Sequence, residues 1–115
     1  MKTKTTPEEA RIARTETVFR HVNERIAETA ESFGSDETEF VCECAEPSCQ
    51  HRLELPLDKY EEVREEATHF LVAHGHEVPG YERVVKHAPG YAIVQKVGRS
   101  LAAAVRRTDP RAETA

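Results

Sequence analysis

All three cysteines of the chain lie within the eight-residue segment 42–49, at positions 42, 44 and 49. Three thiols are one too many for a disulfide and one too few for a tetrahedral zinc site, which takes four donors. Alternate side chains of an extended segment point the same way, so Cys42 and Cys44 can share a metal ion. Pro47-Ser48 predicts a turn that brings Cys49 back toward them. The spacing favours a metal site over three buried free cysteines, and this site needs a fourth ligand.

Six histidines compete for that fourth position. His51 follows the last cysteine by two residues, whereas His74 and His76 lie in a stretch rich in glycine and proline that can fold back onto the cysteines. The spacing leaves these three open. Of the remaining histidines, His21 is interpreted as a surface residue of the first helix and His69 as the end of the second helix. His87 is interpreted as part of a turn.

Composition predicts one soluble domain, since 38% of the 115 residues are hydrophobic and 32% are charged. The net charge of −5 argues against a nucleic-acid partner. Charge is uneven, with an acidic segment at 35–66 and a basic one at 83–111. We expect the two segments to attract each other, and the alternative is a basic docking surface near the C-terminus.

No secretory signal and no apolar run of the roughly 18 residues that a membrane span needs is found. The expected compartment is therefore the cytoplasm, where thiols stay reduced and clustered cysteines hold metal more often than they form disulfides. No membrane partner and no small-molecule substrate is evident from the sequence.

The segment 7–34 predicts a long amphipathic helix. Thr6, Pro7 and Glu9 form a capping box with proline at the first helical position. An apolar stripe recurs at helical spacing, and Gly34 ends the helix; the stripe consists of Ile12, Phe19, Val22, Ile26 and Phe33. A helix of about 39 Å is longer than a small domain is wide, so it either pairs with a second copy or packs along the whole domain.

The rest of the chain predicts an α+β fold. After a disordered tail at 1–6 and the long helix, residues 35–98 form a domain around the cysteines, and residues 99–115 form a short helix with a frayed end. Strands are expected at 39–43 and 52–55, and a helix capped by Asp58 is expected to reach about Ala67. A buried strand or loop entry follows at 70–73, and then a hairpin at 81–86 and 91–97, which we expect to be the central pair of one small antiparallel sheet.

Several motifs together resemble a family of small bacterial proteins. These are the "FVCECAEPSC" knuckle, "RLELPLDKYEEVR", the "FLVAHGHE" loop and "GYAIVQK", preceded by a helix ending "VNERI". The resemblance covers nearly all of residues 12–97. It implies that the metal ligands are Cys42, Cys44, Cys49 and His76. Apart from the resemblance, Glu77 is a candidate to support the adjacent histidine through a hydrogen bond. The chain departs from the family at His74, where proline is frequent. The resemblance implies no activity.

Three functions are compatible with such a site. The first is a small interaction module stabilised by structural Zn²⁺, which binds a protein partner or a second copy through the N-terminal helix. The second is a redox- or metal-responsive regulator with a thiolate zinc or iron–sulfur site. The third, which the sequence favours least, is a zinc enzyme in which Glu43, Glu46 or Glu77 acts as the base.

Overall fold

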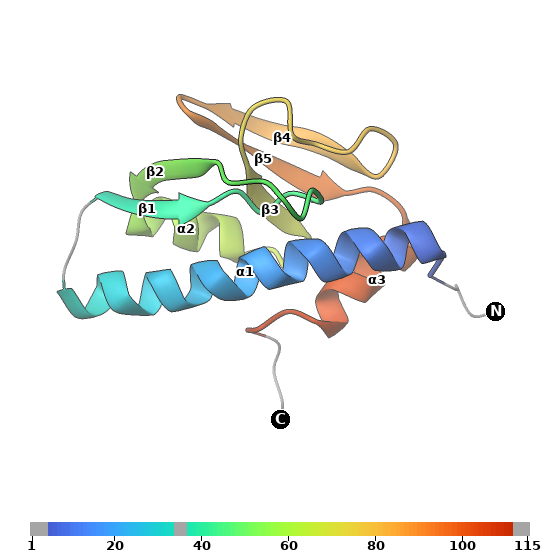
Figure 1. Cartoon of the computed structure of the whole chain (residues 1–115), viewed down its shortest axis with the longest axis horizontal. Helices are drawn as coiled ribbons and strands as arrows, with labels where there is room; N and C mark the ends of the chain where they lie inside the picture. The colour runs from blue at the N-terminus through green and yellow to red at the C-terminus, as the bar shows by residue number, and fades with distance from the viewer. Residues whose placement is uncertain (1–4, 34–36, 112–115) are drawn as a thin grey trace.

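A computed structural model describes residues 5–33 and 37–111 of the chain. It confirms the α+β class (Figure 1). The elements follow in the order α1 (Pro7–Phe33), β1 (Glu37–Val41), β2 (Arg52–Pro56), α2 (Leu57–Arg64), β3 (His69–Val72), β4 (Glu82–Ala88), β5 (Tyr91–Lys96) and α3 (Arg99–Arg107). The helix stop predicted at Gly34, most of the predicted N-terminal tail and the last residues of the frayed end lie outside the described residues.

The start of α1 is the predicted capping box. The backbone N–H of Glu9 donates to Thr6 Oγ1 at 3.1 Å, and the N–H of Thr6 donates to Glu9 Oε1 at 3.0 Å. Two of the N–H groups that a helix N-terminus leaves unpaired are thereby satisfied.

The buried face of α1 differs from the predicted apolar stripe. Ile12 is buried, but Val22 is 41% exposed, while Phe19 and Ile26 are half-buried. The side chain of Phe33 lies outside the described part of the chain. The face that packs on the domain consists of small and polar residues, namely Ala13, Glu16, Arg20, Asn23, Ala27 and Ala30. The predicted stripe holds at Ile12, which is in the core, and at Ile26, which packs against it, but fails at Val22. Buried ion pairs and amide hydrogen bonds, which hydropathy does not register, also determine how the helix is turned.

The strands form two antiparallel sheets where the sequence predicted one. The first pairs β1 with β2, and Glu39 lies opposite Glu54. The second has the order β3-β5-β4, so β5 is central and β4 is an edge strand. The expectation that both hairpin strands are central is therefore wrong. One backbone hydrogen bond, from Glu43 N–H to Leu71 O at 2.7 Å, joins the end of β1 to β3 and so brings the two sheets together.

Some predicted boundaries also shift. The hairpin turn is the pair Pro89-Gly90, so His87 belongs to β4 and not to the turn. Helix α2 ends at Arg64 and not near Ala67, where its end was expected. No side chain caps its start, and Asp58, the predicted cap, lies inside the first turn. His69 begins β3 and does not end the helix, because the chain turns at 65–68.

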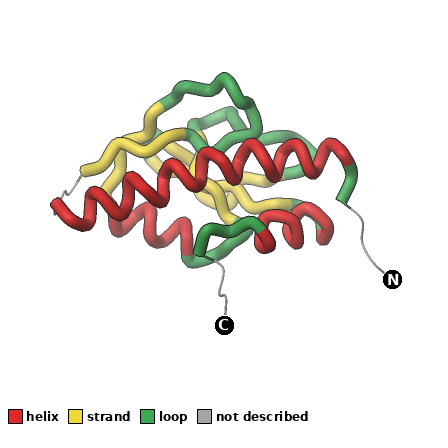
Figure 2. Tube along the Cα trace, turned by 60° about the horizontal axis from the view of Figure 1, so that its bottom comes forward, coloured by secondary structure: helices red, strands yellow, loops and turns green. Residues whose placement is uncertain are grey.

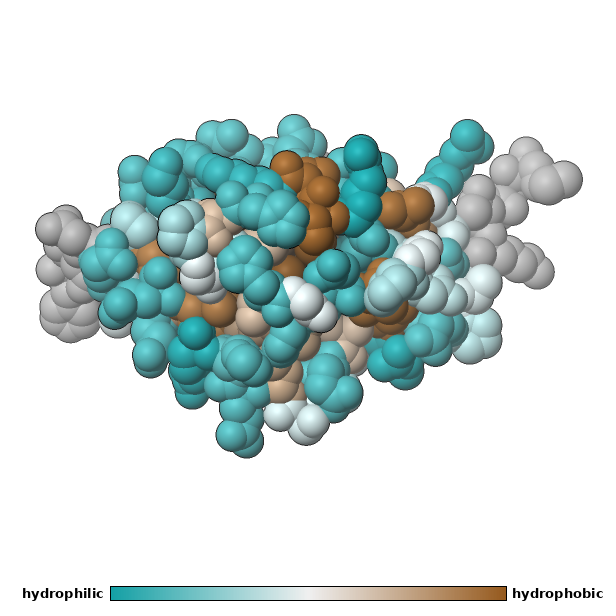
Figure 3. Space-filling model, turned by 90° about the horizontal axis from the view of Figure 1, so that it is seen from above, coloured by the Kyte–Doolittle hydropathy of each residue, from teal (hydrophilic) through white to brown (hydrophobic). Residues whose placement is uncertain are grey.

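The helices and the sheets form two layers. Helices α1 and α3 lie side by side on one face of the strands (Figure 2). Seen from above, the surface is mainly hydrophilic, with apolar residues in small separate clusters (Figure 3). Between the layers lies a core that includes Phe40, Tyr60, Phe70, Leu71 and Leu101.

The core also contains a buried charge cluster. The Lys96 ammonium group on β5 contacts the carboxyl groups of Glu16 of α1 and Glu82 of β4, and all three side chains are inaccessible to solvent. The Lys96 Nζ atom lies 4.1 Å from the centre of the Phe70 ring, and Arg20 packs on the same ring at 3.5 Å. These cations connect α1 to the three-stranded sheet.

Candidate metal centre

Four side chains with metal-binding atoms converge between the two sheets. One donor atom from each of Cys42, Cys44, Cys49 and His76 lies within 4.8 Å of the other three. His76 Nδ1 is 3.6 Å from Cys42 Sγ and 3.7 Å from Cys49 Sγ. No disulfide joins the cysteines. Sulfur atoms around a zinc ion at 2.3 Å stand nearly 4 Å apart, so this spacing matches a tetrahedral set of donors.

The three cysteines are held by the segment that joins β1 to β2, which we term the knuckle (residues 42–51). Cys42 N–H donates to His51 O at 3.2 Å, which closes the base of the knuckle. Cys49 N–H donates to Glu46 O at 3.0 Å, in the turn that the Pro-Ser pair predicted. Cys42 and Cys44 are buried and Cys49 is half-buried.

The histidine comes from the loop that follows β3. His76 N–H donates to Ala73 O at 3.1 Å in a tight turn. Between them Gly75 has a φ of 83°, a left-handed conformation that glycine adopts without strain. The N–H of Ala73 donates to Cys42 Sγ at 3.2 Å, so the same loop also supplies a backbone donor to a sulfur.

The thiols influence one another's protonation. Cys42 donates a hydrogen bond to Cys44, which raises the pKa of Cys42 and lowers that of Cys44 to about 5. Burial raises the pKa of Cys49. A divalent cation bound here would displace the retained protons, because metal ligands must be thiolates.

The other candidate histidines lie outside the group of four donors. The exposed His51 contacts the edge of the His76 ring, with 4.5 Å between ring centres. His74 stacks on His87 at 5.8 Å, and its Nε2 is 2.8 Å from Ala88 O. His21 is exposed on α1, as predicted for a surface residue.

The three glutamates considered as a base have different surroundings. Glu46 accepts hydrogen bonds from the Ser48 N–H and hydroxyl and is exposed. Glu77 is half-buried, with one carboxylate oxygen inaccessible and without a hydrogen bond. Glu43 points away from the sulfurs into the core, because it stands between two cysteines that face the other way.

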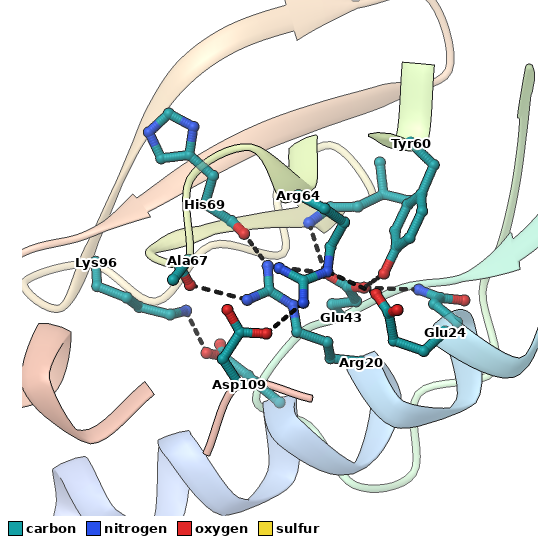
Figure 4. A network of polar contacts seen from close by, with 12 residues as sticks. Arg20, Glu24, Glu43, Tyr60, Arg64, Ala67, His69, Lys96 and Asp109 are labelled. Carbon is teal, nitrogen blue, oxygen red and sulfur yellow. Dashed lines mark hydrogen bonds and ion pairs between the residues drawn. The ribbon is translucent and has the colours of Figure 1, made fainter. Parts of the chain in front are cut away.

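Glu43 anchors the knuckle to the rest of the protein (Figure 4). Its carboxylate accepts three hydrogen bonds, from Tyr60 Oη at 2.8 Å, Asn23 Nδ2 at 2.9 Å and Leu71 N–H at 3.0 Å. Arg20 lies 3.6 Å away as a buried counter-ion. The sequence analysis treated this residue only as a candidate base; its position between two ligand cysteines was the available signal.

The polar network extends from Glu43 toward the C-terminus (Figure 4). Arg20 donates to the carbonyl oxygens of Ala67 and His69, which fixes the turn before β3. Arg64 of α2 pairs with Glu24 of α1 at 2.8 Å and with Asp109 beyond α3. The helices are thus positioned around the strand that leads to the His76 loop.

A cavity of about 300 Å³ is lined by two of the four donor residues, Cys44 and His76. It lies between Arg11 of α1, Cys44 and the loop at Gly75-His76. Arg11 is engaged by Glu8, at 2.5 Å, and approaches Ala45 O at 3.5 Å.

Comparison with protein-family models, with curated proteins and with solved structures finds no match for this chain. Within residues 5–33 and 37–111, no helix is long and apolar enough to cross a bilayer. The fold and the site therefore define the class: a small α+β protein with a cluster of three cysteines and one histidine. Membership of the bacterial family that the sequence resembles stays a prediction.

Proposed function

We propose that this protein is a small interaction module whose fold is stabilised by a structural zinc ion. The observation that carries the proposal is the position of the four donors. Three come from the segment that joins β1 to β2 of one sheet, and the fourth from the loop that follows β3 of the other sheet. A metal held there would add a link between the two sheets, which at this point are also joined by hydrogen bonds between Glu43 and Leu71 and from Ala73 N–H to Cys42 Sγ.

The donor set supports zinc in a structural role. Three sulfurs and one nitrogen fill a tetrahedral shell, whereas a catalytic zinc keeps one position for water. Thiolate ligands also make zinc a weak Lewis acid. A domain of this size gains from a metal, because metal binding contributes directly to the folding free energy. An enzymatic role has no comparable support, since Glu43 is engaged in the core.

The metal can be tested on protein purified without added zinc. We expect colourless protein with one zinc ion per chain. Cobalt substitution should then give the intense visible absorption of a tetrahedral thiolate site. A brown protein containing iron and sulfide, or a cobalt site that holds a water molecule, would contradict the proposal.

A second candidate function is redox-responsive release of the metal in a reducing cytoplasm. It is favoured by Cys49, which is half-buried and is the most accessible of the three cysteines to a peroxide. One equivalent of peroxide, with two protons from solvent, would oxidise two of the zinc-bound thiolates to a disulfide and yield two waters, and the zinc would lose two ligands and be released. Hydrogen peroxide should then release zinc, and a thiol reductant should restore binding. An ordinary structural site would retain its zinc under the same treatment.

The proposed partner is another protein or a second copy, bound through α1. The exposed face of this helix carries Val18, 61% accessible, and Val22, which are one turn apart. Light scattering at micromolar concentration tests self-association, and a monomer would leave a different protein as the partner.

A further inference from the structure

The edge of β1 that faces α1 is only partly paired. In an antiparallel ladder, alternate residues direct their N–H and C=O groups toward the partner strand, and the others direct theirs away. Cys42 N–H donates to His51 O, so residues an even number of positions earlier also face β2. Glu37, Glu39 and Val41 therefore direct their backbone polar groups toward α1.

Part of this edge is filled by other groups. The Asn23 side chain takes the place of a strand at Val41, since it donates to Val41 O at 2.9 Å and accepts from Val41 N–H at 2.8 Å. Beyond it, Glu43 N–H donates to Leu71 O of β3. Across the part of the chain that the structure describes, no hydrogen bond engages the outward N–H or C=O of Glu39. The edge is thus open at its first half only.

A groove runs along this open edge. Its volume is about 580 Å³, within the range of ligand-binding cavities. On the helix side it is lined by Val22, Arg25, Ile26, Thr29 and Ala30, and on the strand side by residues 37–39. The groove therefore combines an apolar helix surface with unpaired backbone groups. Figure 1 shows the C-terminal half of α1 running beside β1.

We propose that this α1–β1 groove binds an extended peptide segment of a partner protein, which adds as a strand to β1 at Glu39. The inference deepens the proposed interaction function and rests on it. Strand addition supplies main-chain hydrogen bonds, and alternate side chains of the added strand face opposite sides of the sheet. On one side they meet Val22 and Ile26, and on the other the exposed carboxylates of Glu37 and Glu39.

The matching segment alternates apolar and basic residues. Its apolar side chains pack on the helix, and its lysines or arginines lie beside the two glutamates. A second copy fits this edge less well, because pairing β1 with another β1 would place Glu37 and Glu39 opposite the same glutamates. Charge complementarity thus points to a different protein with a basic strand.

The test uses the full zinc-loaded chain labelled with ¹⁵N. The probe is a capped hexapeptide of alternating lysine and valine, added during an NMR titration. We expect amide shifts confined to residues 22–30 and 37–41. A peptide with glutamate in place of lysine should bind at least about tenfold more weakly. The same loss is expected for a lysine–valine peptide whose backbone nitrogens facing β1 are methylated.

Two proline variants provide a matched pair. In Glu39→Pro the lost N–H faces the groove and not β2, so the β1–β2 ladder is retained. Its cross-strand neighbour Glu54 also directs its N–H away from the ladder, toward the other edge, so Glu54→Pro is the control. We expect about tenfold weaker peptide binding in the first variant and unchanged binding in the second.

Three results would overturn the proposal. One is the absence of binding by a chain with intact zinc content and dispersed amide signals. Another is equal binding by both proline variants or by the N-methylated peptide. The third is a concentration-dependent shift of β1 amides without peptide, which would assign the groove to a second copy. Zinc content, measured on the same samples, keeps failure of this proposal distinct from failure of the zinc proposal.

Discussion

At the scale of single residues, the candidate centre depends on one imidazole. His76 is the histidine whose ring nitrogen lies among the sulfurs, and Cys42 and Cys49 are its neighbours at under 4 Å. His51 touches the same ring from outside and offers no atom to the group of four. The two histidines are therefore a matched pair for experiment.

We expect His76→Ala to lower zinc affinity and melting temperature together, because the metal loses its fourth ligand and the link between the sheets. The expected loss of affinity is at least tenfold, measured by competition with a chelator. His51→Ala should retain zinc with nearly the affinity of the original chain. Equal zinc affinity in both variants would assign the fourth ligand elsewhere.

Glu43 shows how a residue between two candidate metal ligands can serve the core. Its carboxylate accepts three hydrogen bonds and lies beside Arg20, and no part of the side chain is exposed. We expect Glu43→Gln to reduce the free energy of unfolding by about 2–4 kcal/mol, since Arg20 loses its buried counter-ion. Chemical denaturation of zinc-loaded protein measures the change.

The control for this variant is Glu54→Gln on the exposed face of β2, where we expect little effect. If both variants unfold at the same denaturant concentration, the buried network around Glu43 does not stabilise the fold.

At the scale of elements, the buried face of α1 brings charge into the core. Glu16 lies with Glu82 and Lys96, so two carboxyl groups share one cation without solvent. Burial raises the pKa of Glu16 well above its ordinary value of 4.5, against the attraction of Lys96. Burial also opposes ionisation of Glu82, but hydrogen bonding from Glu16 and the charge of Lys96 lower its pKa overall. Glu16 is thus the group that retains a proton.

This assignment predicts a pH dependence of stability. A group whose pKa is raised by folding stabilises the protein below its unfolded pKa, and the contribution is lost as pH rises through the folded pKa. We therefore expect the unfolding free energy of the native chain to fall, relative to Glu16→Gln, as pH increases above the unfolded value of about 4.5 toward the raised pKa of folded Glu16. Denaturation at several pH values tests this.

For Glu82→Gln we expect the opposite pH dependence of the stability difference from the native chain. A lowered pKa stabilises the folded protein above the unfolded pKa, and this stabilisation is lost as pH falls through the folded pKa. Parallel pH profiles for the native chain and Glu16→Gln would show that Glu16 is ionised in the folded protein.

At the scale of the whole molecule, distant segments meet around the site. Arg111 of the basic C-terminal segment pairs with Glu61 of the acidic segment at 2.7 Å and with Glu24 of α1 at 2.8 Å. This contact agrees with the expected attraction between the two segments. It places the C-terminal segment against α1 and α2, on the helical side of the molecule.

Removal of the metal should loosen both sheets together. We expect chelation to lower the melting temperature and to increase hydrogen exchange in the knuckle and in the loop at 73–78. The physical reason is that a metal held by the four donors would join segments from both sheets, so its loss would remove a cross-link between them. Exchange confined to the knuckle, with the β3 loop unchanged, would show that the loop is held independently of the metal.

The sequence by itself determined the features that depend on near neighbours along the chain. The capping box at Thr6 and Glu9 needs only a three-residue spacing, and Cys42 and Cys44 converge because an extended backbone repeats every two residues. The α+β class followed from similar local periodicities. Which histidine faced the sulfurs depended on where the loop after β3 lay, and spacing could not fix that.

Only the tertiary structure decided which face of α1 is buried. Glu16, Arg20 and Asn23 are polar, and hydropathy assigns them to solvent, yet each finds a buried partner on a distant strand or loop. A charge can be buried when its counter-charge is buried with it, and that pairing is a property of the folded chain as a whole.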